Sequence, residues 1–82
     1  MERSEIFDKT LALVKPFCKN AEGLKNVSEN SRFLTDLGVN SARLVDIVLE
    51  IEDEFNIAID DDSEDKIGTL GDAVNLIESK LN

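Results

Sequence analysis

An apolar stripe in the middle of the chain constrains the fold more than any other feature. Between Ser41 and Phe55, apolar side chains recur at the spacing i, i+3, i+4, i+7 and i+11, at Leu44, Ile47, Val48, Ile51 and Phe55. This period places the five side chains on one face of an α-helix. The sequence therefore predicts a helix over residues 41–55, with Asn56 directly after it as a C-terminal cap.

A first amphipathic helix is predicted near the start of the chain, beginning at Ser4 or Glu5. Its apolar residues at helical spacing are Phe7, Leu11, Val14 and Cys18, with Ile6 and Leu13 beside them. Pro16 has no backbone donor and crowds the preceding turn. The helix is therefore expected to stop near Lys15 or to kink before Cys18.

Further helical structure is predicted after the central helix. Residues 63–67 can form one short helical turn. Thr69 is then placed to cap a last helix, whose shared apolar face holds Leu70, Ala73, Val74 and Ile77. No segment has the alternation expected of a strand.

A long polar connection, residues 20–40, separates the first two predicted helices and contains four asparagines and two glycines. Connections of this length are usually pinned to the core or functional, and the expected pins are Phe33, Leu34 and Leu37. The predicted fold class is all-α: a small up-down four-helix bundle, with three longer helices plus one short helix and a long first loop. Residues 1–82 are expected to form a single domain.

The composition excludes several kinds of active site. The chain has 82 residues, one cysteine and no histidine, so Ser-His, Cys-His and His- or Cys-ligated metal chemistry are excluded. No catalytic residue and no metal site are predicted, and we expect a protein that is not an enzyme. Cys18 cannot form an internal disulfide, which agrees with a reducing compartment. Without an N-terminal apolar segment or a membrane span, the expected location is cytoplasmic, and the expected state is a monomer.

Acidic side chains are concentrated in the second half of the chain. The net charge is -9, and from Asp36 to Glu78 thirteen Asp or Glu face only two bases, Arg43 and Lys66. An acidic surface repels phosphate backbones and attracts basic protein surfaces, which disfavours nucleic-acid binding. A purely solubilising role for these charges remains an alternative at this point.

Ser41 has two interpretations. Either Ser41 or Asn40 has the side-chain oxygen that an N-terminal cap requires. The capping-box partner is missing, because Leu44 occupies the position where Glu or Gln is expected. Ser41 is therefore either a helix cap or a residue to which a group is attached.

The residues around Ser41 follow a longer pattern, from about Val27 to Ile77, that resembles the acyl carrier protein family. The family typically has a Phe, an acidic-Leu-Gly turn, a serine beginning a helix, a "LEEEF"-like end of that helix, an Ile, an acidic run, a Lys-Ile pair and a Thr. The corresponding residues here are Phe33, Asp36-Leu37-Gly38, Ser41, Ile51-Glu52-Asp53-Glu54-Phe55, Ile59, Asp60 to Asp65, Lys66-Ile67 and Thr69. No single motif is specific, but their combination is.

The resemblance implies a function and a cofactor. Ser41 would carry 4′-phosphopantetheine, attached through a phosphodiester by a phosphopantetheinyl transferase that uses coenzyme A and magnesium. Acyl groups would be held on the arm as thioesters during fatty-acid, lipid or secondary-metabolite synthesis.

The resemblance also implies two surfaces. Acyl-loading and acyl-processing enzymes with basic patches would meet the exposed face of the central helix and the residues beside Ser41: Asn40, Ala42, Val45, Asp46, Leu49, Glu52 and Asp53. The acyl chain would be sheltered by residues that otherwise are plain core, namely Val48, Ile51, Ile59 and Ile67.

The chain departs from the family pattern beside Ser41. Asn40 replaces the usual Asp, Ala42 replaces a Leu, and Arg43 stands where acidic or neutral residues are common. These changes favour a specialised carrier that serves one pathway. They leave open an unmodified acidic adaptor that acts by protein-protein interaction. An EF-hand-like reading of residues 60–71 is disfavoured, because Asp65 and Gly71 occupy the places of the required Gly and Glu.

Overall fold

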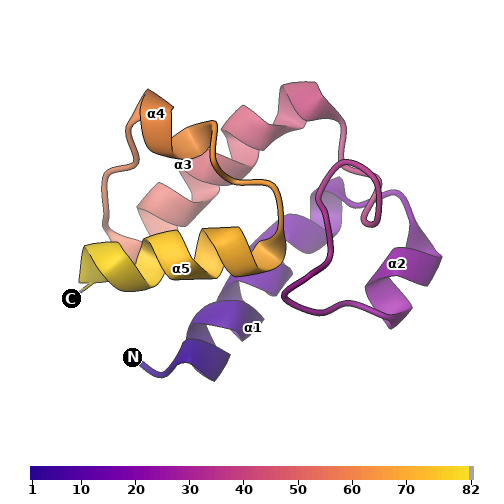
Figure 1. Cartoon of the computed structure of the whole chain (residues 1–82), viewed down its shortest axis with the longest axis horizontal. Helices are drawn as coiled ribbons and strands as arrows, with labels where there is room; N and C mark the ends of the chain where they lie inside the picture. The colour runs from indigo at the N-terminus through magenta and orange to yellow at the C-terminus, as the bar shows by residue number, and fades with distance from the viewer. Residues whose placement is uncertain (82) are drawn as a thin grey trace.

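Three helices of twelve residues form the frame of this computed structural model, which describes residues 1–81 (Figure 1). Two short helices lie in the connections between them. The helices in chain order are α1 Arg3–Val14, α2 Ala21–Lys25, α3 Leu44–Phe55, α4 Asp61–Glu64 and α5 Leu70–Leu81. Within the described residues no strand forms beyond an isolated bridge between Arg32 and Thr69. The predicted all-α bundle of three longer helices and a short one is confirmed, and α2 is an additional short helix.

The core lies where α1 packs against α5 and α3. On α1 the fully buried residues are Ile6, Thr10 and Val14, which follow one another at intervals of four. Thr10 is tolerated there because its hydroxyl donates to the Ile6 carbonyl at 2.7 Å, which satisfies its polar atom. Of the predicted stripe, Val14 is fully buried, and Phe7 and Leu11 are half-buried and pack against this core.

The end of α1 agrees with the effect expected of proline. The α-helix ends at Val14, and Pro16 lies in a 3₁₀ turn over Lys15–Phe17. Cys18 follows this turn in extended conformation, half-buried, with its thiol 3.4 Å from the Val14 carbonyl oxygen. Burial raises the pKa of this thiol.

The connection between α1 and α3 contains α2, which the sequence analysis did not predict. Asn20 caps this helix by accepting from the Gly23 N–H at 3.3 Å, and its amide donates to the Asp36 carbonyl at 3.0 Å. A Cβ on Gly23 would lie 1.8 Å from that carbonyl oxygen, so this position requires glycine. Of the expected pins, Phe33 and Leu37 are fully buried, but Leu34 is 49% exposed and is not a pin.

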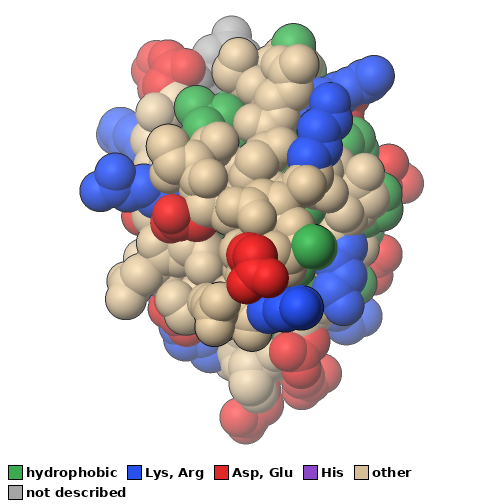
Figure 2. All heavy atoms as spheres, turned by 90° about the vertical axis from the view of Figure 1, so that its right-hand side faces the viewer, with side chains coloured by type: hydrophobic (Ala, Val, Ile, Leu, Met, Phe, Trp, Pro, Cys, Tyr) green, Lys and Arg blue, Asp and Glu red, His purple; other side chains and the backbone are tan. Residues whose placement is uncertain are grey.

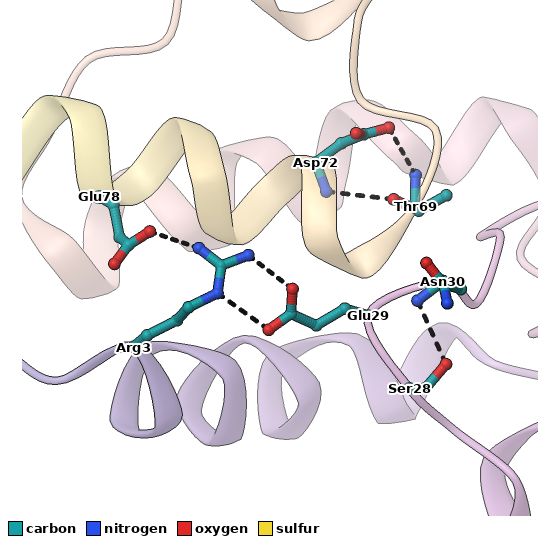
Figure 3. Close-up of polar contacts among 7 residues, drawn as sticks. All are labelled: Arg3, Ser28, Glu29, Asn30, Thr69, Asp72 and Glu78. Atoms are coloured by element: carbon teal, nitrogen blue, oxygen red, sulfur yellow. Dashed lines mark hydrogen bonds and ion pairs between the residues drawn. The ribbon is translucent and has the colours of Figure 1, made fainter.

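Backbone hydrogen bonds fasten this connection to the start of α5. Phe33 N–H donates to the Gly68 carbonyl at 3.1 Å, and Leu70 N–H donates to the Ser31 carbonyl at 3.0 Å. Arg3 adds a side-chain link, because its guanidinium lies between the carboxylates of Glu29 and Glu78 (Figure 3). The long connection is thus fastened to the beginning of α5 and, through Arg3, to α1. These contacts fix the segment that leads into α3.

The short helix α4 begins two residues before the turn that was predicted at 63–67. Asp60 accepts from the Ser63 N–H at 2.8 Å, and hydrogen bonding with Ser63 lowers the pKa of Asp60. This contact caps the turn at Asp60, so the helical turn begins earlier in the chain than predicted.

The start of α5 is as predicted. Thr69 and Asp72 cap it reciprocally (Figure 3), and its predicted apolar face, Leu70, Ala73, Val74 and Ile77, is buried.

Candidate functional site

Ser41 lies at the surface, at the first residue of a 3₁₀ turn that runs into α3. The turn spans Ser41–Arg43, and it is capped by Asn40, whose Oδ1 accepts from the Ala42 N–H at 2.9 Å. The Asn40 carbonyl accepts from the Arg43 N–H at 2.8 Å. Among the described residues the Ser41 hydroxyl has no hydrogen-bond partner. Asn40 therefore performs the capping, which leaves the Ser41 hydroxyl exposed and unused.

An apolar hollow opens directly beside Ser41. We call it the Ser41 hollow; its volume is about 340 Å³. The wall formed by α3 contains Leu44, Val45, Ile47, Val48 and Ile51, and the opposite wall contains Phe33, Leu34, Asp65 and Ile67. Since Ser41 lies at its edge, a flexible chain attached to that side chain has an apolar space within reach.

Three of the four residues proposed to shelter an acyl chain line this hollow: Val48, Ile51 and Ile67. Ile59 does not. It packs against the core, and its backbone N–H donates to Glu52 Oε2 at 2.9 Å. Sequence reasoning missed Leu44 and Ile47 as lining residues, although both belong to the apolar stripe from which the helix was predicted.

The exposed face of α3 contains the two apolar residues proposed for partner binding. Val45 is 51% and Leu49 is 56% exposed, and the two lie four residues apart on the same side of α3. Asp53 is also exposed, and Asn40 and Ala42 lie exposed on either side of Ser41. These residues form one surface that is continuous with the exposed serine.

Two of the proposed docking carboxylates are engaged within the protein. Asp46 forms an ion pair with Arg43, at 3.0 Å between Oδ2 and Nη1. Glu52 is half-buried and holds the Ile59 N–H. Asp53, the third acid proposed for this face, forms no ion pair or side-chain hydrogen bond among the described residues, so its negative charge toward the C-terminal end of α3 is not offset within the protein.

The arrangement at Ser41 suits the covalent attachment of a group. Within residues 1–81, with the side chains that the structure describes, no three His, Cys, Asp or Glu are placed to hold a metal ion. None of the described helices is long and apolar enough to cross a membrane. What the site offers is an exposed hydroxyl, the N-terminal end of a helix that favours an attached anion, and an apolar hollow beside it.

Comparison with known proteins agrees with this geometry. The family described as a phosphopantetheine attachment site matches residues 12–77. The acyl carrier protein of Thermotoga maritima is 39% identical over 79 residues, covering 96% of this chain and 95% of that protein. The chain belongs to the acyl carrier protein family. Acyl carrier protein from Lactobacillus acidophilus is 42% identical over 80 residues, which is 96% of both chains.

A solved structure extends the likeness to the fold. The structure of acyl carrier protein from Enterococcus faecalis matches with a TM-score of 0.78 and 31% identity, over 98% of this chain and 99% of that chain. Acyl carrier proteins are carriers with a covalently attached 4′-phosphopantetheine group, and they interact with phosphopantetheinyl transferases and acyl-processing enzymes. Family membership therefore implies this prosthetic group, and the free hydroxyl beside an apolar hollow fits it.

Proposed function

We propose that this chain carries acyl groups as thioesters on 4′-phosphopantetheine attached to Ser41. The observation that carries the proposal is the division of roles at the start of α3: Asn40 caps the turn, and the Ser41 hydroxyl remains free and exposed. The Ser41 hollow then gives an apolar chain a place away from water, at a gain of about 0.8 kcal/mol for each buried methylene.

The attachment step requires little of the protein itself. Ser41 Oγ forms a bond to the pantetheine-side phosphorus of the coenzyme A diphosphate, the bridging P–O bond breaks so that adenosine 3′,5′-bisphosphate leaves, and the hydroxyl proton passes to the transferase. This chain contributes an accessible nucleophile on a fixed backbone and N–H groups at a helix start, which favour the new phosphodiester. The prosthetic group supplies the thiol that forms thioesters. The chain itself acts as a carrier and not as an enzyme.

Partner binding is proposed at the exposed face of α3 and the residues beside Ser41. Val45 and Leu49 supply apolar contact, while Asp46, Glu52 and Asp53 give the surrounding rim a charge that attracts basic patches on a transferase and on acyl-processing enzymes. Asn40 and Ala42 alter this surface next to the attachment point, which supports a carrier dedicated to one pathway. We further propose that the protein acts as a cytoplasmic monomer of one domain, without nucleic acid as a partner.

Intact-protein mass spectrometry after coexpression with a broad-specificity phosphopantetheinyl transferase tests the attachment. The wild type should gain the mass of one phosphopantetheine, and Ser41→Ala should abolish the gain. Ser79→Ala is the matched control, because Ser79 is also an exposed serine but lies on α5, where its hydroxyl donates to the Leu76 carbonyl. Modification of Ser41→Ala would place the attachment elsewhere.

The effect of Asn40 gives a second test. Asn40→Asp keeps an oxygen that accepts from the Ala42 N–H, so the cap is preserved, while the new carboxylate adds charge beside a magnesium-assisted reaction. The transfer rate should rise. If wild type, Asn40→Asp and the double variant Asn40→Asp with Ala42→Leu all stay unmodified by several transferases, an unmodified acidic adaptor becomes the better account.

A further inference from the structure

The sign of the charge changes along one stripe of α3 that begins beside Ser41. Four charged residues follow one another at the spacing i, i+3, i+7 and i+10, which places them on one side of the helix: Arg43, Asp46, Glu50 and Asp53. Arg43 is the last residue of the 3₁₀ turn that begins with Ser41. The stripe therefore starts with a cation close to Ser41 and continues with three acids.

The acids of this stripe differ in how far their charge is compensated. Arg43 Nη1 lies 3.0 Å from Asp46 Oδ2, so the two charges nearest Ser41 offset each other. Glu50 and Asp53 are exposed and form no ion pair among the described residues. At about 1.5 Å of rise per residue, they lie roughly 10 and 15 Å from Arg43 along the helix axis. The unbalanced negative charge is thus distant from Ser41.

The fold does not account for the positive charge of Arg43. The side chain is 64% exposed, and exposed ion pairs contribute little to stability. A cation at the beginning of a helix also opposes the helix dipole, which favours acidic side chains there. The turn is capped by Asn40, so it does not need the Arg43 side chain.

Arg43 is also not placed to hold a group attached to Ser41. Residues two positions apart on a helical turn do not face each other. The Arg43 guanidinium is directed along α3 to Asp46. Its exposed part therefore faces the surface of a protein that docks at Ser41.

We propose that Arg43 is a specificity-determining residue of the docking surface: it selects enzymes that place a carboxylate beside the entrance to their active site and basic side chains opposite Glu50 and Asp53. This inference rests on the proposed attachment at Ser41 and on docking at the exposed face of α3. Opposite charges across an interface favour one partner, and like charges reject another. An enzyme whose basic patch reaches its active-site entrance is therefore disfavoured, because one of its cations meets Arg43.

The probe is a broad-specificity phosphopantetheinyl transferase that has Lys or Arg side chains around its active-site entrance. Its kcat/KM for this chain should rise several-fold with Arg43→Gln and further with Arg43→Glu, through a lower KM and an unchanged kcat. Arg43→Lys should keep the wild-type value, because it keeps the charge. The gain should shrink as salt is added, since exposed charges are screened. Circular dichroism controls for folding.

Lys9→Gln is the matched control. Lys9 Nζ lies 3.5 Å from Glu54 Oε2, so this variant also removes one positive charge and releases one carboxylate of α3. Lys9 belongs to α1, however, and Glu54 lies at the end of α3 opposite to Ser41. Its kcat/KM should stay near the wild-type value. A gain equal to that of Arg43→Gln would show that net charge, and not the position of Arg43, sets the rate.

Charge exchange on the transferase tests the expected carboxylate. The Lys and Arg residues around its entrance are replaced singly by Glu, and each variant is assayed with wild type, Arg43→Glu and Asp53→Lys. At least one entrance variant should be faster on wild type than on Arg43→Glu, which reverses the order found with the unaltered transferase. Double-mutant cycles separate this pairwise effect from the effects of the single changes. The same entrance variant should show no coupling with Asp53→Lys.

The possible failures are distinct. If the unaltered transferase modifies neither wild type nor Arg43→Gln, the proposed attachment fails, and this inference fails with it. If wild type is modified but Arg43→Gln and Arg43→Glu keep its kcat/KM, the attachment stands and Arg43 selects no partner. A fall in kcat for Arg43→Gln would place Arg43 in the transfer reaction itself and would overturn the inference. Entrance variants that all fail to couple with Arg43→Glu would do the same.

Discussion

At the scale of single residues, Asn40 and Ser41 are adjacent side chains of similar chemistry with different positions on the backbone. Asn40 has extended backbone angles, φ -68° and ψ 132°, whereas Ser41 is already inside the 3₁₀ turn. A capping residue lies just before the first turn and has this extended conformation, which lets its side chain accept from a free N–H of that turn. Here that N–H belongs to Ala42. The turn can therefore keep its cap while Ser41 reacts.

We predict unequal losses of stability when these two residues are replaced by alanine. Asn40→Ala should lower the free energy of unfolding by about 1 kcal/mol, because the Ala42 N–H loses its partner. Ser41→Ala should change it by only a few tenths of a kcal/mol, within the range of ordinary surface substitutions. Urea unfolding of the two purified variants measures both values. A larger loss of unfolding free energy for Ser41→Ala than for Asn40→Ala would show that Ser41, and not Asn40, caps the turn.

The sequence left this point open for a physical reason. Both side chains present an oxygen acceptor, and the pattern does not reveal which residue adopts the extended conformation before the turn. Ser41 was nevertheless predicted as the attachment residue from its neighbours, because the Leu37-Gly38 turn and the helix after it have a recognisable spacing. The full lining of the Ser41 hollow could not be predicted, since it depends on how Phe33, Leu34 and Ile67 pack opposite α3.

At the scale of elements, Glu52 links α3 to the connection that follows it. Asn56 ends the helix in the left-handed conformation, with φ 54° and ψ 50°, which reverses the chain direction. Glu52 Oε2 then accepts from the Ile59 N–H at 2.9 Å. A residue proposed for docking thus also determines where the chain leaves α3.

Glu52→Ala should loosen this connection, and Asp53→Ala should not. Both variants remove one carboxylate from the same helix, but only Glu52 reaches Ile59. Amide hydrogen exchange at Ile59 should become faster in Glu52→Ala and stay unchanged in Asp53→Ala, because exchange follows local opening. Equal exchange rates in the two variants would show that the hydrogen bond from Ile59 to Glu52 does not stabilise this connection.

The same helix gives a prediction about docking. Reversing Asp46 and Asp53 to Lys should slow transfer onto Ser41, because the rim would then repel basic patches on the transferase. The wild-type rate should also fall as added salt shortens the Debye length to about 10 Å and below. Initial rates of transfer, with circular dichroism as a control for folding, measure both effects. Unchanged rates in folded variants would remove this face from the proposal.

The elements themselves differed in how well the sequence predicted them. The helices α3 and α5 were predicted because their apolar period and caps agree. The short helix α2 was not, because its five residues show no period and it exists through contacts of Asn20 and Gly23 with Asp36, a residue far along the chain. Thr10 was overlooked for a similar reason, since its burial depends on a hydroxyl bond to its own helix.

At the scale of the whole molecule, Arg3 joins three parts of the chain. Its guanidinium donates to both carboxylate oxygens of Glu29, at 2.9 and 2.6 Å, and it pairs with Glu78 on α5 (Figure 3). The start of α1, the long connection and the last helix thereby meet at one side chain. On the face of the molecule that Figure 2 shows, Lys, Arg, Asp and Glu side chains are dispersed, and the hydrophobic areas are small.

The Arg3 contact makes stability depend on pH. The hydrogen bond with Arg3 lowers the pKa of Glu29 below its ordinary value. Because the folded state favours the ionised carboxylate, the stabilisation is present above the ordinary glutamate pKa. It is lost as the pH falls through the lowered pKa of the folded state. The exposure of the pair keeps the effect small and sensitive to salt.

We therefore predict that Arg3→Gln is less stable than wild type near neutral pH and that the difference shrinks as the solution is acidified toward and through the folded pKa of Glu29. Urea unfolding at a series of pH values gives this difference directly. Lys25→Gln is the matched control, because it removes the same charge from a pair with Glu22 whose side chains are 73% and 80% exposed, and it should differ little from wild type at any pH. Glu29→Gln should reproduce the part of this pH profile that comes from Glu29, since it removes that carboxylate and leaves the pair of Arg3 with Glu78 in place. A stability difference for Arg3→Gln that stays constant across the acidic range would show that Arg3 acts through packing alone.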